Sequence, residues 1–339
     1  MEKLMKKHVI LVAGLLLLAI LSACQSARAD APKAAATEAA TEVEAPSLAT
    51  AAAVTRLSNQ PGRAIVSARG NHFIVDSVPP IGGPNEEINP LDVMLGAMAT
   101  CGTFIYETAA QEMGIDLDGI TATVEGDFDP AGLKGEGVDP RLQAFRVHLD
   151  VPGATEEQLE ELEKAYTTRC PIYTTLSRSA PIEITTNEEQ PSSPAEGLAT
   201  GIAVAQVSNQ PGRAIVSARG NHFVVDSVPP LGGPNEERNP MDLALGALGT
   251  CATFLYETAA QEMDIPLYDI TTTVEGDFDP RGLKNGEVNP RIQALRVKIE
   301  LDGPTAEQAE QLEKAYTTRC PIYTTLVRAA PIEIENVTK

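Results

Sequence analysis

The longest stretch of apolar positions with helical spacing follows Asn89-Pro90 in the chain. Its apolar face is formed by Leu91, Met94, Leu95, Met98, Cys101 and Ile105. Asparagine is a favoured helix cap and proline suits the first helical turn, so the pattern predicts a helix that begins at Pro90. Small side chains between the apolar positions predict a buried, closely packed helix, and Gly114 predicts its end.

Shorter alternating runs on both sides of this segment predict strands. Residues 64–67 and 72–76 flank Arg69-Gly70-Asn71 and predict a hairpin, while residues 120–125 and 142–151 predict two more strands. A capping box at residues 155–158 predicts a helix to about residue 168. Cys170-Pro171 then favours a short helix capped by Cys170, and residues 181–184 predict a last strand. The order of elements is that of an α+β domain.

This whole pattern occurs twice in the chain. The segment NQPGRAIVSARGNHF begins at Asn59 and returns unchanged at Asn209, which is 150 residues later. Roughly 70% of the positions agree between the two copies, so a complete domain has been duplicated. Exchanges that keep volume and apolarity, such as Ile74 for Val224, indicate core positions in both copies.

The N-terminus has the pattern of an export signal. Three lysines precede an apolar run over residues 9–21, and Leu21-Ser22-Ala23-Cys24 follows. This resembles a bacterial lipobox, which implies lipidation of Cys24 and an exported protein anchored on the extracytoplasmic side of the membrane. A single transmembrane anchor is the alternative, but the apolar run is short and lacks a basic flank after it.

Composition separates the two domains from flexible segments. Residues 24–53 and 186–202 are rich in small and polar side chains and lack a sustained apolar period. The predicted organisation is a signal peptide (1–23), a tether (24–53), a first domain (54–185), a linker (186–202) and a second domain (203–339).

Charge excludes one class of partner. The 339 residues include 47 acidic and 26 Lys or Arg side chains, a formal net charge of −21. Such a surface repels phosphate backbones, which argues against nucleic-acid binding. Tryptophan is absent and aromatic residues make up 4% of the chain, so the core is predicted to be aliphatic.

The five cysteines comprise Cys24 and one pair in each copy, namely Cys101 with Cys170 and Cys251 with Cys320. A structural disulfide is the default in an exported protein. A metal site is disfavoured because neither copy has a C-x-x-C pair, and no metal or cofactor is predicted. A redox pair is the third interpretation.

Arginines near the cysteines favour redox chemistry. Arg169 and a helix start both favour a thiolate at Cys170, whereas Cys101, on an apolar helix face, needs an added cation. Arg63 or Arg69, on the hairpin, are the candidates for that cation.

Two strings carry a family resemblance. The first runs from Gly82-Gly83-Pro84 through Asn89-Pro90-Leu91-Asp92 to Ala97-Met98-Ala99-Thr100-Cys101, and the second is TRCPIYTTL, which begins at Thr168. Together, and twice over, they resemble the OsmC/Ohr family of organic hydroperoxide resistance proteins, particularly its OsmC-like branch.

The resemblance implies a fold and a set of residue roles. The family forms an intertwined homodimer with sheets wrapped around two central helices, so the two copies of this chain are expected to form an intramolecular pseudo-dimer. Cys101 and Cys251 match the attacking cysteine, and Cys170 and Cys320 match the resolving one. Arg63 and Arg213 resemble the family's arginine loop.

One position departs from the family pattern. Where peroxidase members carry glutamate after Asn-Pro, this chain has Leu91 and Met241, and an acidic residue follows one position later as Asp92 and Asp242. Asp92 lies nine residues before Cys101, which on an ideal helix is half a turn away from the cysteine's face.

The resulting hypothesis is a thiol peroxidase. It reduces organic or lipid hydroperoxides through a two-cysteine cycle of sulfenic acid and disulfide, with an unidentified thiol or dithiol as reductant. Disulfide exchange with exported proteins and a non-catalytic module with structural disulfides are the alternatives.

Overall fold

The computed structural model describes residues 48–339, which belong to one compact unit. The predicted signal peptide, Cys24 and all but the end of the predicted tether lie outside the described residues. Lipidation and membrane anchoring therefore stay predictions.

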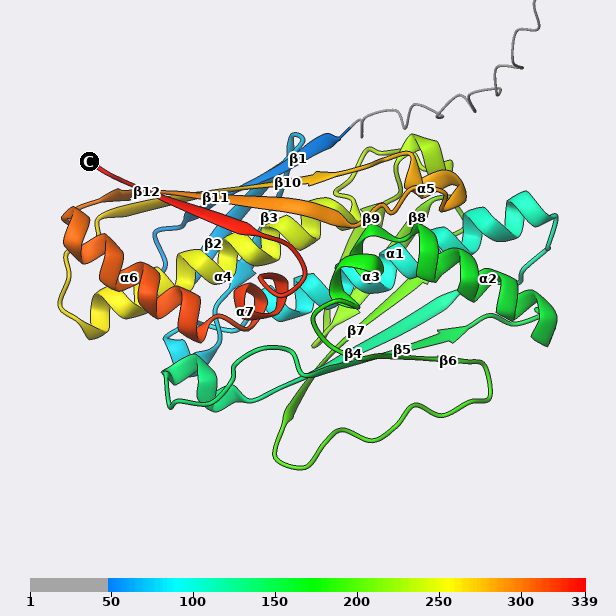
Figure 1. Cartoon of the computed structure of the whole chain (residues 1–339), viewed down its shortest axis with the longest axis horizontal. Helices are drawn as coiled ribbons and strands as arrows, with labels where there is room; N and C mark the ends of the chain where they lie inside the picture. Colours follow the sequence, from blue (N-terminus) through cyan, green and yellow to red (C-terminus); the bar gives the residue numbers. More distant parts are fainter. Residues whose placement is uncertain (1–47) are drawn as a thin grey trace, which may run out of the picture. The chain divides into compact units, whose positions relative to one another are not determined.

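Two long helices, α1 (Pro90–Met113) and α4 (Pro240–Glu262), pack against each other at the centre of the molecule (Figure 1). Asn89 caps α1 in a reciprocal capping box with Asp92, and Gly114 ends the helix with φ +68°. Both predicted ends of the helix are confirmed. In the described residues only α4 is long and apolar enough to cross a membrane, but 89% of its most apolar window is buried inside the molecule.

Small residues on the central helices permit close packing, as predicted. A Cβ atom on Gly96 of α1 would lie 3.2 Å from Val216 of the second repeat. A Cβ atom on Gly249 of α4 would lie 2.7 Å from Thr55 Oγ1 of the first repeat. Each central helix therefore packs tightly against strands of the other repeat.

Two six-stranded sheets each combine strands from both repeats. The first sheet has the order β12-β11-β10-β1-β2-β3, and the second has the order β6-β5-β4-β7-β8-β9. The first contains β1 (Ala49–Leu57), β2 (Arg63–Ala68), β3 (Asn71–Asp76), β10 (Asp269–Phe278), β11 (Ile292–Asp302) and β12 (Ile332–Thr338). The second contains β4 (Thr121–Phe128), β5 (Ala144–Asp150), β6 (Ile182–Thr186), β7 (Ala199–Val207), β8 (Arg213–Ala218) and β9 (Asn221–Asp226).

Within each sheet, the strands of the two repeats join through one antiparallel pairing, β1 with β10 in the first sheet and β7 with β4 in the second. The N-terminal hairpin of each repeat thus completes the sheet of the other repeat. Helix α4 packs on the first sheet and α1 on the second (Figure 1). The α+β class and the pairing of the two copies are confirmed.

Strands β1 and β7 correct the predicted domain boundaries. β1 begins at Ala49, inside the predicted tether, and β7 begins at Ala199, inside the predicted linker. Alanine and threonine dominate β1, so it lacks the large alternating side chains that mark a strand. Local sequence does not predict this strand, because its partner, β10, lies more than 200 residues later in the chain.

Shorter helices complete each repeat. Helix α2 (Glu156–Arg169) follows the predicted capping box at Thr155, and α3 (Pro171–Leu176) starts at the predicted proline. Their copies are α6 (Ala306–Arg319) and α7 (Pro321–Leu326). The connections contain η1 (Pro79–Ile81), η2 (Pro130–Lys134), η3 (Pro229–Leu231) and the single turn α5 (Gly282–Asn285).

Candidate active site

Each cysteine pair is joined as a disulfide within its own repeat. Cys101 binds Cys170 with Cα atoms 6.0 Å apart, and Cys251 binds Cys320 with Cα atoms 6.3 Å apart. The helix cysteines retain 5% exposure, whereas Cys170 and Cys320 are fully buried. The two members of a pair therefore differ in their access to small molecules.

Local sequence explains the position of Cys170. It ends α2 and caps α3, and Pro171 prevents the two helices from merging because proline has no N–H for the ladder. The backbone N–H of Tyr173 donates a hydrogen bond to Cys170 Sγ at 3.2 Å. The predicted capping role of Cys170 is confirmed, and Cys320 repeats it with Tyr323.

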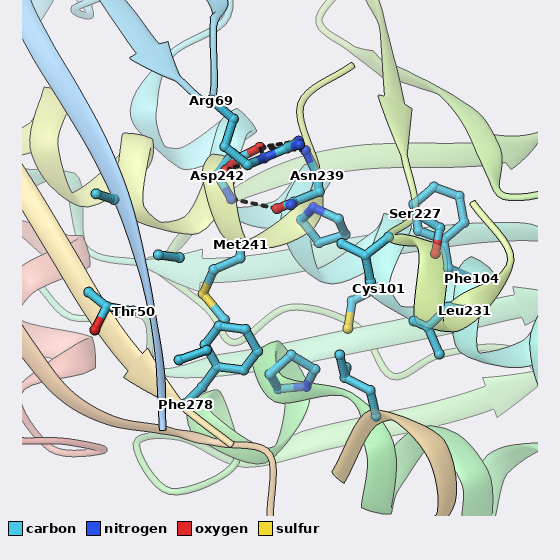
Figure 2. Close-up of a pocket in the computed structure, with 17 residues that line it drawn as sticks. Thr50, Arg69, Cys101, Phe104, Ser227, Leu231, Asn239, Met241, Asp242 and Phe278 are labelled. Carbon is cyan, nitrogen blue, oxygen red and sulfur yellow. Dashed lines mark hydrogen bonds and ion pairs between the residues drawn. The ribbon is translucent and has the colours of Figure 1, made fainter. Parts of the chain in front are cut away.

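A cavity of about 430 Å³ opens beside Cys101. Both repeats form its wall: Cys101, Phe104 and Pro171 come from the first repeat, whereas Met241 and Phe278 come from the second. Figure 2 shows the Cys101 side chain between Met241 and Leu231. Cys170 does not line this cavity. The helix cysteine is thus the member of the pair that faces the cavity.

A charged cluster joins the two repeats at one end of the same cavity (Figure 2). Arg69 donates to Asp242 at 2.7 Å, to Asn235 at 2.7 Å and to the carbonyl of Glu237 at 2.8 Å. Asp242 is 1% exposed and also closes the capping box of α4 with Asn239. Arg69 therefore holds the N-terminus of α4 against the hairpin of the other repeat.

The copy of this cluster involves Asp92. Arg219 donates to Asp92 at 2.7 Å, to Asn85 at 2.8 Å and to the carbonyl of Glu87 at 2.6 Å. Burial raises the pKa of Asp92, and hydrogen bonds from Asn89 and Arg219 only partly offset this. Asp92 and Asp242 thus bind the second arginine of the opposite hairpin, in an arrangement that the sequence did not reveal.

Arg63 and Arg213 are placed differently from the prediction. Arg63 binds Asp76 through two hydrogen bonds of 2.7 and 2.8 Å, and also binds Glu86 at 2.8 Å. Neither Arg63 nor Arg213 lines a cysteine cavity. Asp76 comes from the neighbouring strand β3, so this arginine ties its own hairpin together. Of the two arginines proposed as the cation near Cys101, the structure brings Arg69 to the cavity.

Ser227 is a cavity residue that the sequence analysis missed. It is 1% exposed, lines the cavity, and its hydroxyl has no hydrogen-bond partner among the described residues. Ser77 has the same position beside Cys251 and the same unpartnered hydroxyl. Nothing in the local sequence Val-Asp-Ser-Val indicates that this serine lines a cavity, because only the fold brings it near the cysteine of the other repeat.

The second cavity, beside Cys251, is much smaller. Its volume is about 80 Å³, and its lining includes Ser77, Leu91, Phe254 and Pro321. Cys320 does not line it, in agreement with the first site. The two sites share a cysteine and a buried serine, but they differ in size, and the arginine and aspartate of the charged cluster line only the first cavity.

Asp277 binds β1, the strand that borders the first cavity. Thr50 of β1, which lines that cavity, donates to Asp277 at 2.6 Å, and Arg296 binds the same carboxylate at 2.6 Å. Hydrogen bonds from Arg296, the largest influence, lower the pKa of Asp277 to about 2. The charged carboxylate is thus the form that the folded protein stabilises.

Replacing this carboxylate, Asp277→Asn, is expected to lower the free energy of unfolding by about 1 kcal/mol at pH 7. Because the folded pKa lies below the unfolded value, the stabilisation is complete above about pH 4 and disappears as the pH falls toward 2. Urea unfolding of both proteins from pH 7 to pH 2 measures this. Asp302→Asn, at an exposed strand end, is the control. A difference that stays constant over this range would contradict the assignment.

A family model described as OsmC-like protein matches the chain twice, over residues 83–185 and 233–335, which together exceed half its length. No curated protein matches the chain.

Solved structures with similarity to the chain include three bacterial proteins. An OsmC-like protein from Mycoplasma pneumoniae has 14% identity and a TM-score of 0.35, and the match covers 40% of this chain and 94% of that one. An organic hydroperoxide resistance protein OsmC from Legionella pneumophila has 19% identity, a TM-score of 0.34, and coverage of 40% and 96%. The organic hydroperoxide resistance protein OhrB of Bacillus subtilis has 18% identity, a TM-score of 0.30, and coverage of 40% and 96%.

Proposed function

Because the chain belongs to the OsmC-like protein family, we propose that it is a thiol peroxidase that reduces organic hydroperoxides. The reacting pairs are Cys101 with Cys170 and Cys251 with Cys320. One observation carries the proposal: in both repeats the helix cysteine lines a cavity while its disulfide partner is buried behind it. A purely structural disulfide needs no such cavity.

The proposed cycle starts from the reduced pair. The Cys101 thiolate attacks the terminal oxygen of the hydroperoxide, the O–O bond breaks, and the oxygen attached to carbon takes a proton from solvent and leaves as the alcohol. Cys101 is then a sulfenic acid. The Cys170 sulfur attacks the Cys101 sulfur, water leaves, and the disulfide forms. An external thiol or dithiol supplies two electrons and two protons to restore both thiols.

The cavity wall supplies groups that fit the first step. Arg69 and the N-terminus of α4 lie at one end of the cavity. Asp242 pairs with Arg69 and caps α4, which offsets much of their positive charge, and the remainder favours a thiolate. Most of the remaining lining is apolar, which suits the organic part of the substrate.

Two short helices place the resolving cysteine. The Cα separation of 6.0 Å between Cys101 and Cys170 lies within the range of ordinary disulfides, so the fold accommodates the bond. The Tyr173 N–H that donates to Cys170 Sγ also favours a thiolate at the resolving position.

The proposal is tested by stopped-flow oxidation of the fully reduced protein with cumene hydroperoxide and, separately, with hydrogen peroxide. Thiol counting accompanies each reaction. We expect two thiols to be lost per peroxide consumed, at a rate at least about 100-fold above that of the same chain unfolded in urea. Loss of thiols at the rate of the unfolded chain, for both peroxides, would refute the proposal.

A further inference from the structure

The two cysteine sites differ in size although their reacting residues are identical. The cavity beside Cys101 measures about 430 Å³ and that beside Cys251 about 80 Å³. Ligand pockets for organic molecules span about 300–1,000 Å³, whereas one water molecule occupies about 30 Å³ of the liquid. The first cavity therefore admits a bulky organic molecule, and the second admits only a molecule of a few heavy atoms.

A pair of exchanged residues accounts for the smaller cavity. A Cβ atom on Gly201 of β7 would lie 2.6 Å from Leu91 Cδ2 and 3.1 Å from Leu95 Cδ1. Leu91 thus packs directly on the backbone of β7, and it does so because position 201 has no side chain. Leu91 lines the second cavity, but no residue of β7 does.

In the first site, the two residues at the corresponding positions leave open the space between the central helix and the strand. Ala51 of β1 takes the place of Gly201, and Met241 of α4 takes the place of Leu91. The methyl group of Ala51 occupies the position into which Leu91 packs in the other site. Residues 49–52 of β1 and Met241 consequently all line the first cavity.

We propose that the two sites divide substrates by size. The Cys101 site takes hydroperoxides with a bulky aryl or long alkyl group, and the Cys251 site takes small peroxides such as hydrogen peroxide. This inference rests on the proposed peroxidase function. The selectivity is set by positions 91 and 201 in one site and by positions 241 and 51 in the other, not by the cysteines.

Two chains with one working site each test the proposal. Cys251→Ser/Cys320→Ser leaves the Cys101 site, and Cys101→Ser/Cys170→Ser leaves the Cys251 site. The second-order rate constants for cumene hydroperoxide and hydrogen peroxide are measured for each chain. We expect the ratio of the two constants to favour cumene hydroperoxide at least about 10-fold more in the chain that keeps Cys101.

Exchanging the residues at positions 91 and 201 for those at positions 241 and 51, and the reverse, provides the matched variants. Leu91→Met/Gly201→Ala in the chain that keeps Cys251 should raise its preference for cumene hydroperoxide toward that of the other site. Met241→Leu/Ala51→Gly in the chain that keeps Cys101 should lower it. Thermal unfolding of each variant checks that the fold is intact.

A binding measurement separates the two proposals. Titration of the oxidised, unmutated chain with 2-phenyl-2-propanol, the alcohol formed from cumene hydroperoxide, should show one binding site per chain, and Met241→Leu/Ala51→Gly should weaken it. Equal substrate ratios in the two chains, or two equal sites for the alcohol, would overturn the division by size while leaving the peroxidase function intact. Absence of reaction in both chains would overturn both proposals.

Discussion

Replacing both helix cysteines, Cys101→Ser with Cys251→Ser, is expected to lower the rate of organic hydroperoxide reduction by about 10³-fold or more. Serine keeps the size of the side chain but not its nucleophilicity, because its hydroxyl is not ionised near neutral pH. Both cavities remain, so substrate can still bind without reacting. Steady-state consumption of cumene hydroperoxide with dithiothreitol as the reductant measures the loss.

The matched control is Cys170→Ser with Cys320→Ser, which removes the same two disulfides but keeps the attacking thiols. This variant should still consume one peroxide per site in a rapid first turnover, although it cannot form the native disulfide afterwards. If the two double variants lost the first turnover equally, disulfide removal itself would explain the effect and the assignment of Cys101 and Cys251 would be wrong.

Loss of an arginine that joins the repeats, Arg69→Met, is expected to lower the free energy of unfolding by about 3 kcal/mol. Asp242 is 1% exposed, so the substitution leaves a buried carboxylate without its cation. Asn235 and the carbonyl of Glu237 lose their donors at the same time. Arg219→Met should act alike, because Arg219 binds Asp92 and is equally exposed.

Chemical unfolding of the oxidised chain measures the difference. Lys164→Met is the control, since Lys164 and Glu161 form an exposed pair with a separation of 3.8 Å, whose loss should cost less than about 0.5 kcal/mol. Equal destabilisation by Arg69→Met and Lys164→Met would show that the contact between the repeats contributes little. A larger effect of Arg69→Met shows that the contact between the repeats stabilises the fold.

Local sequence patterns predicted most of the elements because their causes are local. The Asn89 cap and Gly114 defined α1, and the capping box at Thr155 defined α2. The sequence predicted Cys170 as the cap of α3 because a proline follows it. Each of these features depends on hydrogen bonds between residues a few positions apart, which a sequence displays directly.

Contacts between the repeats could not be predicted in this way. β1 is rich in alanine and threonine and owes its place to β10, so its sequence resembles a tether. The same limitation explains the arginine assignment. Arg63 matched a family motif, but Arg69 is the residue that binds Asp242 and lines the cavity, and only the crossing of the hairpins brings these two together.

The difference in size between the two cavities likewise could not be predicted from the sequence, because it depends on tertiary structure. Ala51 and Gly201 differ by one methyl group, and Met241 and Leu91 have similar volumes, so neither exchange stands out in the sequence. Their effect arises because each helix residue faces a strand of the other repeat.

The central claim, that the cavity-lining cysteine attacks the peroxide, is tested most directly by locating the first oxidation product. Reduced Cys170→Ser/Cys320→Ser protein is treated with one equivalent of cumene hydroperoxide per site in the presence of dimedone, which traps sulfenic acids, and the adducts are mapped by peptide mass spectrometry. We expect the adduct on Cys101, and on Cys251 to a smaller extent, with none in the protein that also carries Cys101→Ser/Cys251→Ser. Unmodified thiols at both positions after peroxide treatment would contradict the account.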